Sequence, residues 1–173
     1  LTGKTSVPVS AVSIVLSADA DELERAAAGE LARLLKDKAE VEVPVASAAA
    51  EDRFAVILKR GALAALAAHP NPEQAYTIAP LLSGNSRQGR GLVLSAGTGA
   101  GVYYAGKTLQ QFLAPTIRGK GDAATVEMPV VTITDWPDLE ERGEWGGSAA
   151  EDLEWMADRK FNLIERHGEL TLD

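Results

Sequence analysis

The chain has 173 residues, of which 46% are hydrophobic and 24% are charged, and its formal net charge is −8. This length suffices for one ordinary domain, or for one domain and part of a second. The lack of cysteine excludes disulfides, thiolate zinc sites and cysteine nucleophiles. The acidic balance argues against nucleic acid or an anionic membrane as a partner, and no apolar run is long enough to span a bilayer.

The negative charge is concentrated near the carboxyl end of the sequence. Asp135 to Asp173 hold 12 acidic and four basic residues, a balance of −8, so the preceding 134 residues are neutral. A solvated acidic face is one explanation. The shift also coincides with Trp136-Pro137, where proline restricts the preceding residue to extended backbone. We therefore expect a small domain over 1–134 and the start of a second domain over 135–173.

Strand and helix patterns alternate through the first half of the chain. β-Branched residues predict a strand over Val7–Leu16, and Asp19–Glu22 has the form of a capping box that begins an amphipathic helix. Alternating valines predict a strand over Val41–Val45, and a short apolar run predicts another over Phe54–Leu58. An alanine-rich helical turn then ends at His69-Pro70.

Two further strands and a second long helix follow. Gln74–Leu82 and Gly91–Ser95 are expected to pair across a polar, glycine-containing loop. Thr98 is a candidate cap for a helix to about Leu113, and Pro129–Thr134 is expected to add a strand. The predicted fold class is α/β, a mixed β-sheet covered mainly on one face by two long helices.

The pattern restarts after the acidic boundary. Arg142–Gly146 is expected to form a short strand, Ser148–Glu151 a capping box for a helix to Lys160, and Phe161–Glu165 a second strand. Strand, helix and strand at this spacing form one βαβ unit, which needs parallel neighbours to bury its strands.

A glycine-rich turn, Gly97–Gly101, lies between a predicted strand and a predicted helix. That position suits a phosphate or dinucleotide, but neither glycine frame completes GxGxxG, because Val102 or Tyr104 occupies the last position. Glycines that permit a tight turn and close packing of helix on sheet are the simpler explanation. The two histidines, His69 and His167, belong to no HExxH motif, so no metal site is expected.

The segment Asp135–Glu144 holds five carboxylates and one arginine, Arg142. Paired carboxylates can hydrolyse glycosidic bonds when they lie about 5 to 10 Å apart, but nothing in the sequence selects a pair. Arg142 is a candidate for binding vicinal hydroxyls, and an ion pair with a neighbouring glutamate is the alternative.

Several segments together resemble the N-terminal domain of family 20 glycoside hydrolases, the β-N-acetylhexosaminidases. Gly91–Ser95, Ala100–Leu113 and Pro129–Pro137 are similar to that family's strand, its AG-(V/L)-(F/Y)-Y-G-x-(Q/K)-T-L helix and its V-x-I-x-D-x-P strand. Arg142-Gly143 looks like the Arg-Gly that opens the family's catalytic (β/α)₈ barrel, and Asp152–Ile164 like the barrel's first helix and second strand.

The resemblance implies that residues 1–134 form a small non-catalytic domain and that 135–173 form the truncated start of a (β/α)₈ barrel. It implies that Arg142 lies at the carboxyl end of the first barrel strand and binds sugar hydroxyls. The family's catalytic Asp-Glu pair would lie beyond Asp173, so we expect this chain alone to contain no catalytic residue and to be inactive. The partners implied are the chain's own barrel and a glycan of N-acetylhexosamine type.

The same resemblance implies substrate-assisted catalysis by the 2-acetamido oxygen, with no metal or organic cofactor. It also implies a secreted or periplasmic bacterial protein, although Leu1–Lys4 has no apolar signal and any leader is absent from this sequence. Glu144–Ser148 departs from the apolar strand usual after Arg-Gly. Family 84 O-GlcNAcases and family 67 α-glucuronidases therefore stay open, as does a self-contained domain that binds an anionic ligand at Gly97–Gly101.

Overall fold

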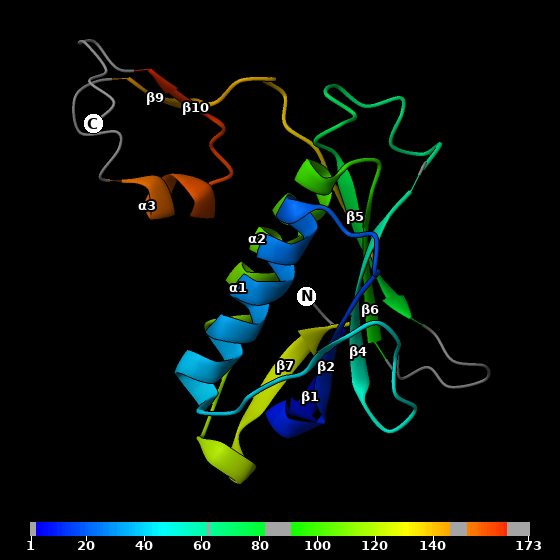
Figure 1. The fold of residues 1–173 in the computed structure, drawn as a ribbon, viewed down its shortest axis with the longest axis vertical. Coiled ribbons are helices and arrows are strands. Elements are labelled where there is room, and N and C mark those ends of the chain that lie inside the picture. Colours follow the sequence, from blue (N-terminus) through cyan, green and yellow to red (C-terminus); the bar gives the residue numbers. More distant parts are fainter. Residues whose placement is uncertain (1–2, 62, 82–90, 146–151, 166–173) are drawn as a thin grey trace. The chain divides into compact units, whose positions relative to one another are not determined.

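A computed structural model describes residues 3–61, 63–81, 91–145 and 152–165 (Figure 1). The chain divides into two compact units, Leu1–Pro137 and Asp138–Asp173, and each is described by itself below. Within the described ranges, no helix combines the length and the apolar character needed to cross a membrane.

The first unit contains a six-stranded mixed sheet with the order β3-β2-β4-β6-β5-β8. Its strands are β2 (Val12–Leu16), β3 (Val45–Ala46), β4 (Phe54–Arg60), β5 (Tyr76–Leu81), β6 (Gly91–Ala96) and β8 (Ile133–Asp135). Neighbours from β3 to β6 run parallel, whereas β5 runs antiparallel to both β6 and β8. This arrangement confirms the predicted α/β class with a mixed sheet.

Two long helices accompany the sheet, α1 (Glu22–Ala39) and α2 (Gly99–Leu113), and Figure 1 shows them side by side. Gly106 permits this closeness, because a Cβ there would lie 3.1 Å from the Cβ of Ala27. Helices and strands bury a common apolar core, in which the largest aliphatic side chains are those of Ile14, Leu31, Leu35, Leu58, Ile78, Leu92, Leu94, Leu109 and Leu113.

The single strand predicted over Val7–Leu16 is wrong, because two strands of different sheets occupy that range. β1 (Lys4–Pro8) pairs antiparallel with β7 (Thr125–Pro129) in a separate sheet, and a 3₁₀ turn, Val9–Ala11, leads from β1 into β2. Pro8 carries no N–H for a continuing ladder, and the N–H of Val9 turns to the carbonyl of Ala124 at 2.9 Å.

Two other predicted strands differ in extent from the observed ones. Instead of Pro129–Thr134, β7 ends at Pro129 and β8 begins at Ile133, with a 3₁₀ turn, Gly121–Ala123, before β7. Of the predicted strand Val41–Val45, only Val45 belongs to an observed strand. Pro44 has no N–H, so it takes part in the sheet only through its carbonyl, which accepts from the Ile14 N–H. Val43 is buried in the core.

The capping box of α1 begins two residues later than predicted. Asp21 Oδ1 accepts from the Glu24 N–H at 2.9 Å, and Glu24 Oε2 accepts from the Asp21 N–H at 2.8 Å. The sequence offers the same spacing at Asp19–Glu22, but Asp19 accepts instead from the hydroxyl of Ser17. The capping box forms at Asp21–Glu24 because this frame buries the Glu24 side chain, which is 2% exposed, beside Arg60, the last residue of β4.

The second unit contains β9 (Gly143–Trp145), α3 (Leu153–Asp158) and β10 (Leu163–Glu165). β9 and β10 pair in parallel, and Gly143 allows their close approach because a Cβ there would collide with the carbonyl of Leu163. The predicted capping box Ser148–Glu151 lies outside the described residues.

Candidate functional site

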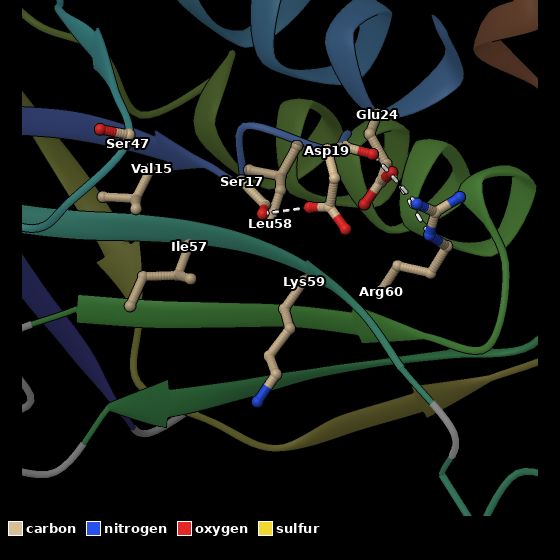
Figure 2. Close-up of a pocket in the computed structure, with 9 residues that line it drawn as sticks. All are labelled: Val15, Ser17, Asp19, Glu24, Ser47, Ile57, Leu58, Lys59 and Arg60. Atoms are coloured by element: carbon tan, nitrogen blue, oxygen red, sulfur yellow. Dashed lines mark hydrogen bonds and ion pairs between the residues drawn. The ribbon is translucent and has the colours of Figure 1, made fainter. Parts of the chain in front are cut away.

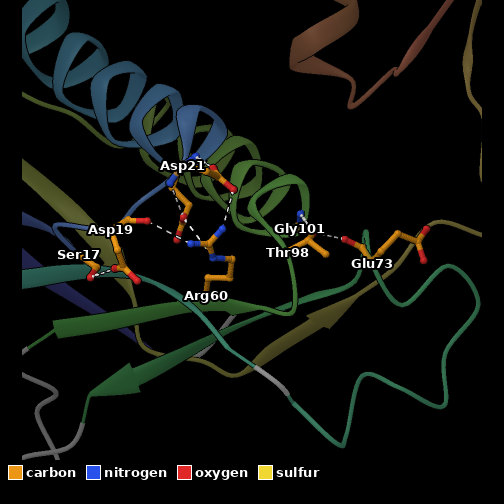
Figure 3. A network of polar contacts seen from close by, with 8 residues as sticks. Ser17, Asp19, Asp21, Arg60, Glu73, Thr98 and Gly101 are labelled. Atoms are coloured by element: carbon orange, nitrogen blue, oxygen red, sulfur yellow. Dashed lines mark hydrogen bonds and ion pairs between the residues drawn. The ribbon is translucent and has the colours of Figure 1, made fainter.

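The glycine-rich turn Gly97–Gly101 connects β6 to α2, as predicted, and Thr98 caps the helix. Its hydroxyl accepts from the Gly101 N–H at 3.2 Å and donates to the carbonyl of Glu73 (Figure 3). The start of α2 is therefore tied to the segment that precedes β5.

Close packing explains the glycines of this turn. A Cβ on Gly101 would lie 2.6 Å from the Ala96 Cβ and 2.7 Å from the Ala75 carbonyl oxygen, and a Cβ on Gly99 would collide with the Asp21 carboxylate. An anionic ligand at the start of α2 would meet that carboxylate, and like charges repel. The turn therefore fits the packing explanation better than an anion site.

A charged network lies at the carboxyl ends of β2 and β4 (Figure 3). Arg60 Nη1 donates to Asp21 Oδ2 at 3.1 Å, Nη2 donates to the Asp19 carbonyl at 3.2 Å, and Nε lies 3.6 Å from Glu24 Oε2. Because Glu24 is buried, its charge depends on Arg60 and on the Asp21 N–H for compensation. The network fixes the start of α1 against the ends of two central strands.

Beside this network is a cavity of about 370 Å³ (Figure 2). Val15 and Ile57 provide its apolar wall, and its polar lining includes Ser17, Ser47 and Lys59. In open α/β sheets ligands bind at carboxyl ends of strands where neighbouring connections diverge, and β2 and β4 meet that description. Of the two carboxylates that line the cavity, Asp19 accepts from the Ser17 hydroxyl, which lowers the pKa of Asp19, and Glu24 is compensated by Arg60.

The conspicuous helix segment Ala100–Leu113 serves to pack α2. Tyr103, Lys107 and Gln110, spaced along one face, all reach Glu30 of α1, with distances of 3.0, 2.6 and 3.2 Å to its carboxylate oxygens. Lys107 is 4% exposed, so this ion pair lies within the interface between the helices. Tyr103, Lys107 and Gln110 thus hold α1 and α2 together.

The same helix also reaches the last strand of the sheet. The Tyr76 hydroxyl donates to the Asp135 carboxylate and lies 2.5 Å from the Thr108 hydroxyl. Because a phenol has one proton, Thr108 donates to the phenol oxygen. Burial, followed by the hydrogen bond to Asp135, raises the pKa of Tyr76, so the phenol stays protonated and keeps donating.

The two residues after Asp135 are also bound by the first unit. The Trp136 ring stacks on His69 with centroids 3.7 Å apart and planes inclined by 16°. Asn71, held at a φ of 48°, donates from Nδ2 to the Pro137 carbonyl at 2.9 Å. We call Asp135–Pro137 the exit segment, since each of its three residues is fixed just before the second unit begins.

Arg142 lies at the amino end of β9, so the expected position at the carboxyl end of that strand is wrong. Its guanidinium donates to the carbonyls of Leu139 at 2.6 Å and Lys160 at 2.8 Å. Asn162 accepts from the Arg142 N–H at 2.8 Å and donates to the Glu140 carbonyl at 2.9 Å. Arg142 and Asn162 thus join the segments that lead into β9 and β10.

The sequence did not reveal the partners of the exit segment or of Arg142. Tyr76, His69 and Asn71 carry no local signal, and only the fold brings them to the exit segment. Asn162 lies within Asp152–Ile164, the segment that resembles the barrel's first helix and second strand, but the resemblance gave it no role. Within the described ranges, no group of three or more His, Asp or Glu side chains is arranged to hold a metal ion.

The family model for glycosyl hydrolase family 20, domain 2, matches residues 2–136. The chain belongs to this family. Glycosyl hydrolase family 20 domain 2 thus accounts for the mixed sheet, for α1 and α2 and for the exit segment up to Trp136. No curated protein matches the chain.

Solved structures share the fold at low sequence identity. A Streptomyces plicatus N-acetyl-beta-hexosaminidase is 19% identical with a TM-score of 0.64, and the match covers 95% of this chain and 31% of that one. A Vibrio harveyi GH20 exo beta-N-acetylglucosaminidase is 19% identical with a TM-score of 0.63, over 96% and 23% of the two chains. A GH138 enzyme targeting pectin rhamnogalacturonan II is 14% identical with a TM-score of 0.61, over 90% and 18%. The chain thus spans a third or less of these structures.

Substitution of Gly101 tests the packing explanation of the family 20 turn. We expect Gly101→Ala to lower the free energy of unfolding by about 1–3 kcal/mol, because the new methyl group collides with Ala96 and with the Ala75 backbone. Gly97→Ala is the matched control, since a Cβ there meets nothing within 4 Å. Urea denaturation of both variants is the measurement, and equal stability of the two would contradict the explanation.

Two truncations test the exit segment. A fragment ending at Pro137 should melt cooperatively near the temperature of the whole chain, because it retains the complete first unit. A fragment ending at Asp135 loses the His69 stack and the Asn71 hydrogen bond, so its Tm should be about 3–8 °C lower. Differential scanning calorimetry measures both; identical melting would mean that these contacts contribute no stability.

Proposed function

We propose that this chain is the non-catalytic N-terminal portion of a glycoside hydrolase that acts on N-acetylhexosamine-type glycans. The small domain, 1–134, holds the exit segment, and the residues from 135 onward begin a (β/α)₈ barrel. In this proposal the two long helices cover mainly one face of the mixed sheet, and the catalytic Asp-Glu pair lies beyond Asp173.

The contacts of the exit segment carry the proposal. Asp135, Trp136 and Pro137 are each bound by a different residue of the family 20 domain, namely Tyr76, His69 and Asn71. Such contacts fix the position and direction in which the chain leaves the domain. Tyr103, Lys107 and Thr108 of α2 are engaged in packing, which suits a domain that supports a catalytic partner.

The second unit has the features expected of an incomplete barrel. Parallel strands are stable when both faces are covered, yet β9 and β10 form a two-stranded sheet. Most of the exposed large hydrophobic side chains of the described chain belong to this unit: Leu139, Trp145, Leu153, Trp155, Leu163 and Ile164. Further βα units would bury them. The structural matches, which cover 95% of the chain, also extend past residue 136.

The partners in this proposal are the chain's own barrel and the glycan. Hydrolysis would follow the substrate-assisted route, in which the 2-acetamido oxygen attacks the anomeric carbon while an acid of the barrel protonates the leaving oxygen. Secretion or periplasmic export is part of the proposal, supported by the bacterial sources of the similar hexosaminidases. An O-GlcNAcase-like or α-glucuronidase-like parent is the alternative, and the shared fold of a GH138 enzyme targeting pectin rhamnogalacturonan II supports keeping it.

We propose a role for Arg142 on the sequence resemblance, namely hydrogen bonding to sugar hydroxyls in the complete enzyme. In the described chain, the Arg142 guanidinium donates to the carbonyls of Leu139 and Lys160. The same two contacts favour a second role, in which Arg142 positions the starts of β9 and β10.

The purified 173-residue chain should hydrolyse no aryl N-acetyl-β-glucosaminide, whereas the complete protein should. General acid catalysis needs a positioned carboxyl group, and the proposed pair lies outside this chain. Release of the aryl group is followed for both proteins under the same conditions. Turnover by the chain that disappears when one of its own acids is substituted would contradict the proposal.

Substituting Arg142 by lysine separates its two roles in the complete enzyme. Lysine keeps the charge but loses the planar fork. A lost hydroxyl contact of about 1.5–3 kcal/mol would lower kcat/KM about 10- to 150-fold with little change in Tm. A purely positioning role would instead lower Tm. Arg159→Lys is the control, because Arg159 lies over the Trp155 ring, 4.0 Å from its centroid. Activity of Arg142→Lys within about twofold of wild type removes Arg142 from the sugar site.

A further inference from the structure

Aliphatic and polar residues line the cavity at the carboxyl ends of β2 and β4 (Figure 2). Val15 is opposite Ile57 in the register of the two strands, so both lie on the face of the sheet opposite to the core residue Ile14. Lys59 follows Ile57 by two residues on the same face, and Ser17 directly follows β2. The cavity, of about 370 Å³, therefore has an aliphatic floor and a polar rim.

The cavity also lies where the connections of the sheet diverge. β2 leads through α1 to β3 on one side, whereas its other neighbour, β4, leads on to β5 and β6 on the other side. Crevices at such points are where open α/β sheets bind ligands. The volume of the cavity is within the range of small-molecule sites, about 300–1,000 Å³.

Three side chains of the rim keep the capacity to bind a ligand. Within the part of the chain that the structure describes, neither Lys59 nor Ser47 forms a hydrogen bond or an ion pair. Asp19 accepts from the Ser17 hydroxyl through Oδ1, which leaves Oδ2 as an acceptor. The rim thus offers an ammonium donor, a hydroxyl group and a carboxylate acceptor, all on exposed residues.

The charges of the lining favour a neutral ligand. Its two carboxylates, Asp19 and Glu24, disfavour an anion, and its two cations, Lys59 and Arg60, disfavour a further cation. A purely apolar ligand would remove water from Lys59 and Asp19 without replacing its hydrogen bonds. A hydroxyl group both donates and accepts, so a neutral molecule with several hydroxyl groups satisfies the ammonium and the carboxylate together.

The spread of the polar groups favours a sugar ring over a zwitterion. Ser47 follows β3, Asp19 follows β2 and Lys59 belongs to β4, three neighbouring strands that together span about 10 Å. An amino acid carries both of its charges at one end, so it would meet only one side of this rim. A pyranose carries hydroxyl groups around its ring, and its C–H groups suit the floor of Val15 and Ile57.

We propose that this cavity of the family 20 domain is a non-catalytic sugar site. The ring lies on Val15 and Ile57, Asp19 accepts from one hydroxyl group, and Lys59 and Ser47 donate to others. This inference goes beyond the proposed function and does not depend on it, because every residue of the site belongs to the first unit.

The experiment titrates the isotope-labelled 173-residue chain and follows its amide signals by NMR. The neutral probes are glucose, N-acetylglucosamine and chitobiose, and the charged comparisons are glucuronate, alanine and inorganic phosphate. We expect at least one neutral sugar to shift the signals of Ser17, Ser47 and Lys59 saturably, with a Kd on the order of 1 mM.

Three variants test the assignment of the contacts. Lys59→Met and Asp19→Ala should each weaken sugar binding by about 5-fold or more, because each removes a charge-assisted hydrogen bond. Lys38→Met is the matched control, since Lys38 is an exposed lysine of α1 that does not line the cavity. It should bind as the wild type does. The Tm of each variant is measured beside binding, and we expect it to stay within about 2 °C of wild type because these side chains are exposed.

Each other outcome overturns the inference. If no neutral sugar causes a saturable shift at concentrations well above the expected Kd, the polar rim is only solvated. If alanine or phosphate binds there and no neutral sugar does, the cavity takes a charged ligand. If a sugar binds but Lys59→Met weakens it no more than Lys38→Met does, the sugar lies elsewhere. All of these results leave the proposed function standing, since none of them measures hydrolysis by the complete protein.

Discussion

The buried carboxylate of Glu24 is the charge on which the arrangement of the first unit depends. It is compensated by the Asp21 N–H and by Arg60, the last residue of β4. Because Asp21 also accepts from Arg60 and lies against Gly99, the same cluster locates the start of α1, the end of β4 and the start of α2. Leaving such a carboxylate unpaired is costly, so these elements come together in one arrangement.

Contacts extend from this cluster to the end of the domain. With its start fixed, α2 presents Thr108 to Tyr76, and Tyr76 donates to Asp135 in the last strand. Apolar packing alone would allow β8 to shift, whereas this polar chain selects one register, Tyr76 opposite Asp135. The family 20 domain thereby fixes the position at which its chain leaves.

The sequence predicted elements whose signals are local. Thr98 caps α2 as expected, and β4 and β6 lie where their apolar runs indicate, because cap chemistry and hydrophobic runs are short-range features. The sequence-based predictions failed where a residue distant in the sequence determines which local arrangement forms. Asp19 and Asp21 are equivalent in spacing, and the ion pairs of Arg60 with Asp21 and with the buried Glu24 favour the later frame. Likewise, the pairing of Tyr76 with Asp135 joins residues that no local pattern connects. The wrong position of Arg142 came from the resemblance, whereas the strand predicted over Arg142–Gly146 placed Arg142 at the amino end, where the structure has it.

The pairing of β1 with β7 has a consequence for biosynthesis. Thr5 lies opposite Met128 and Lys4 binds Glu127, so the first strand finds its partner only after more than a hundred further residues have been made. Contacts of such sequence separation form slowly, since a long loop must close before they are gained. On the ribosome β1 therefore waits as an unpaired edge until β7 emerges, and the domain completes its folding only just before its successor begins to appear.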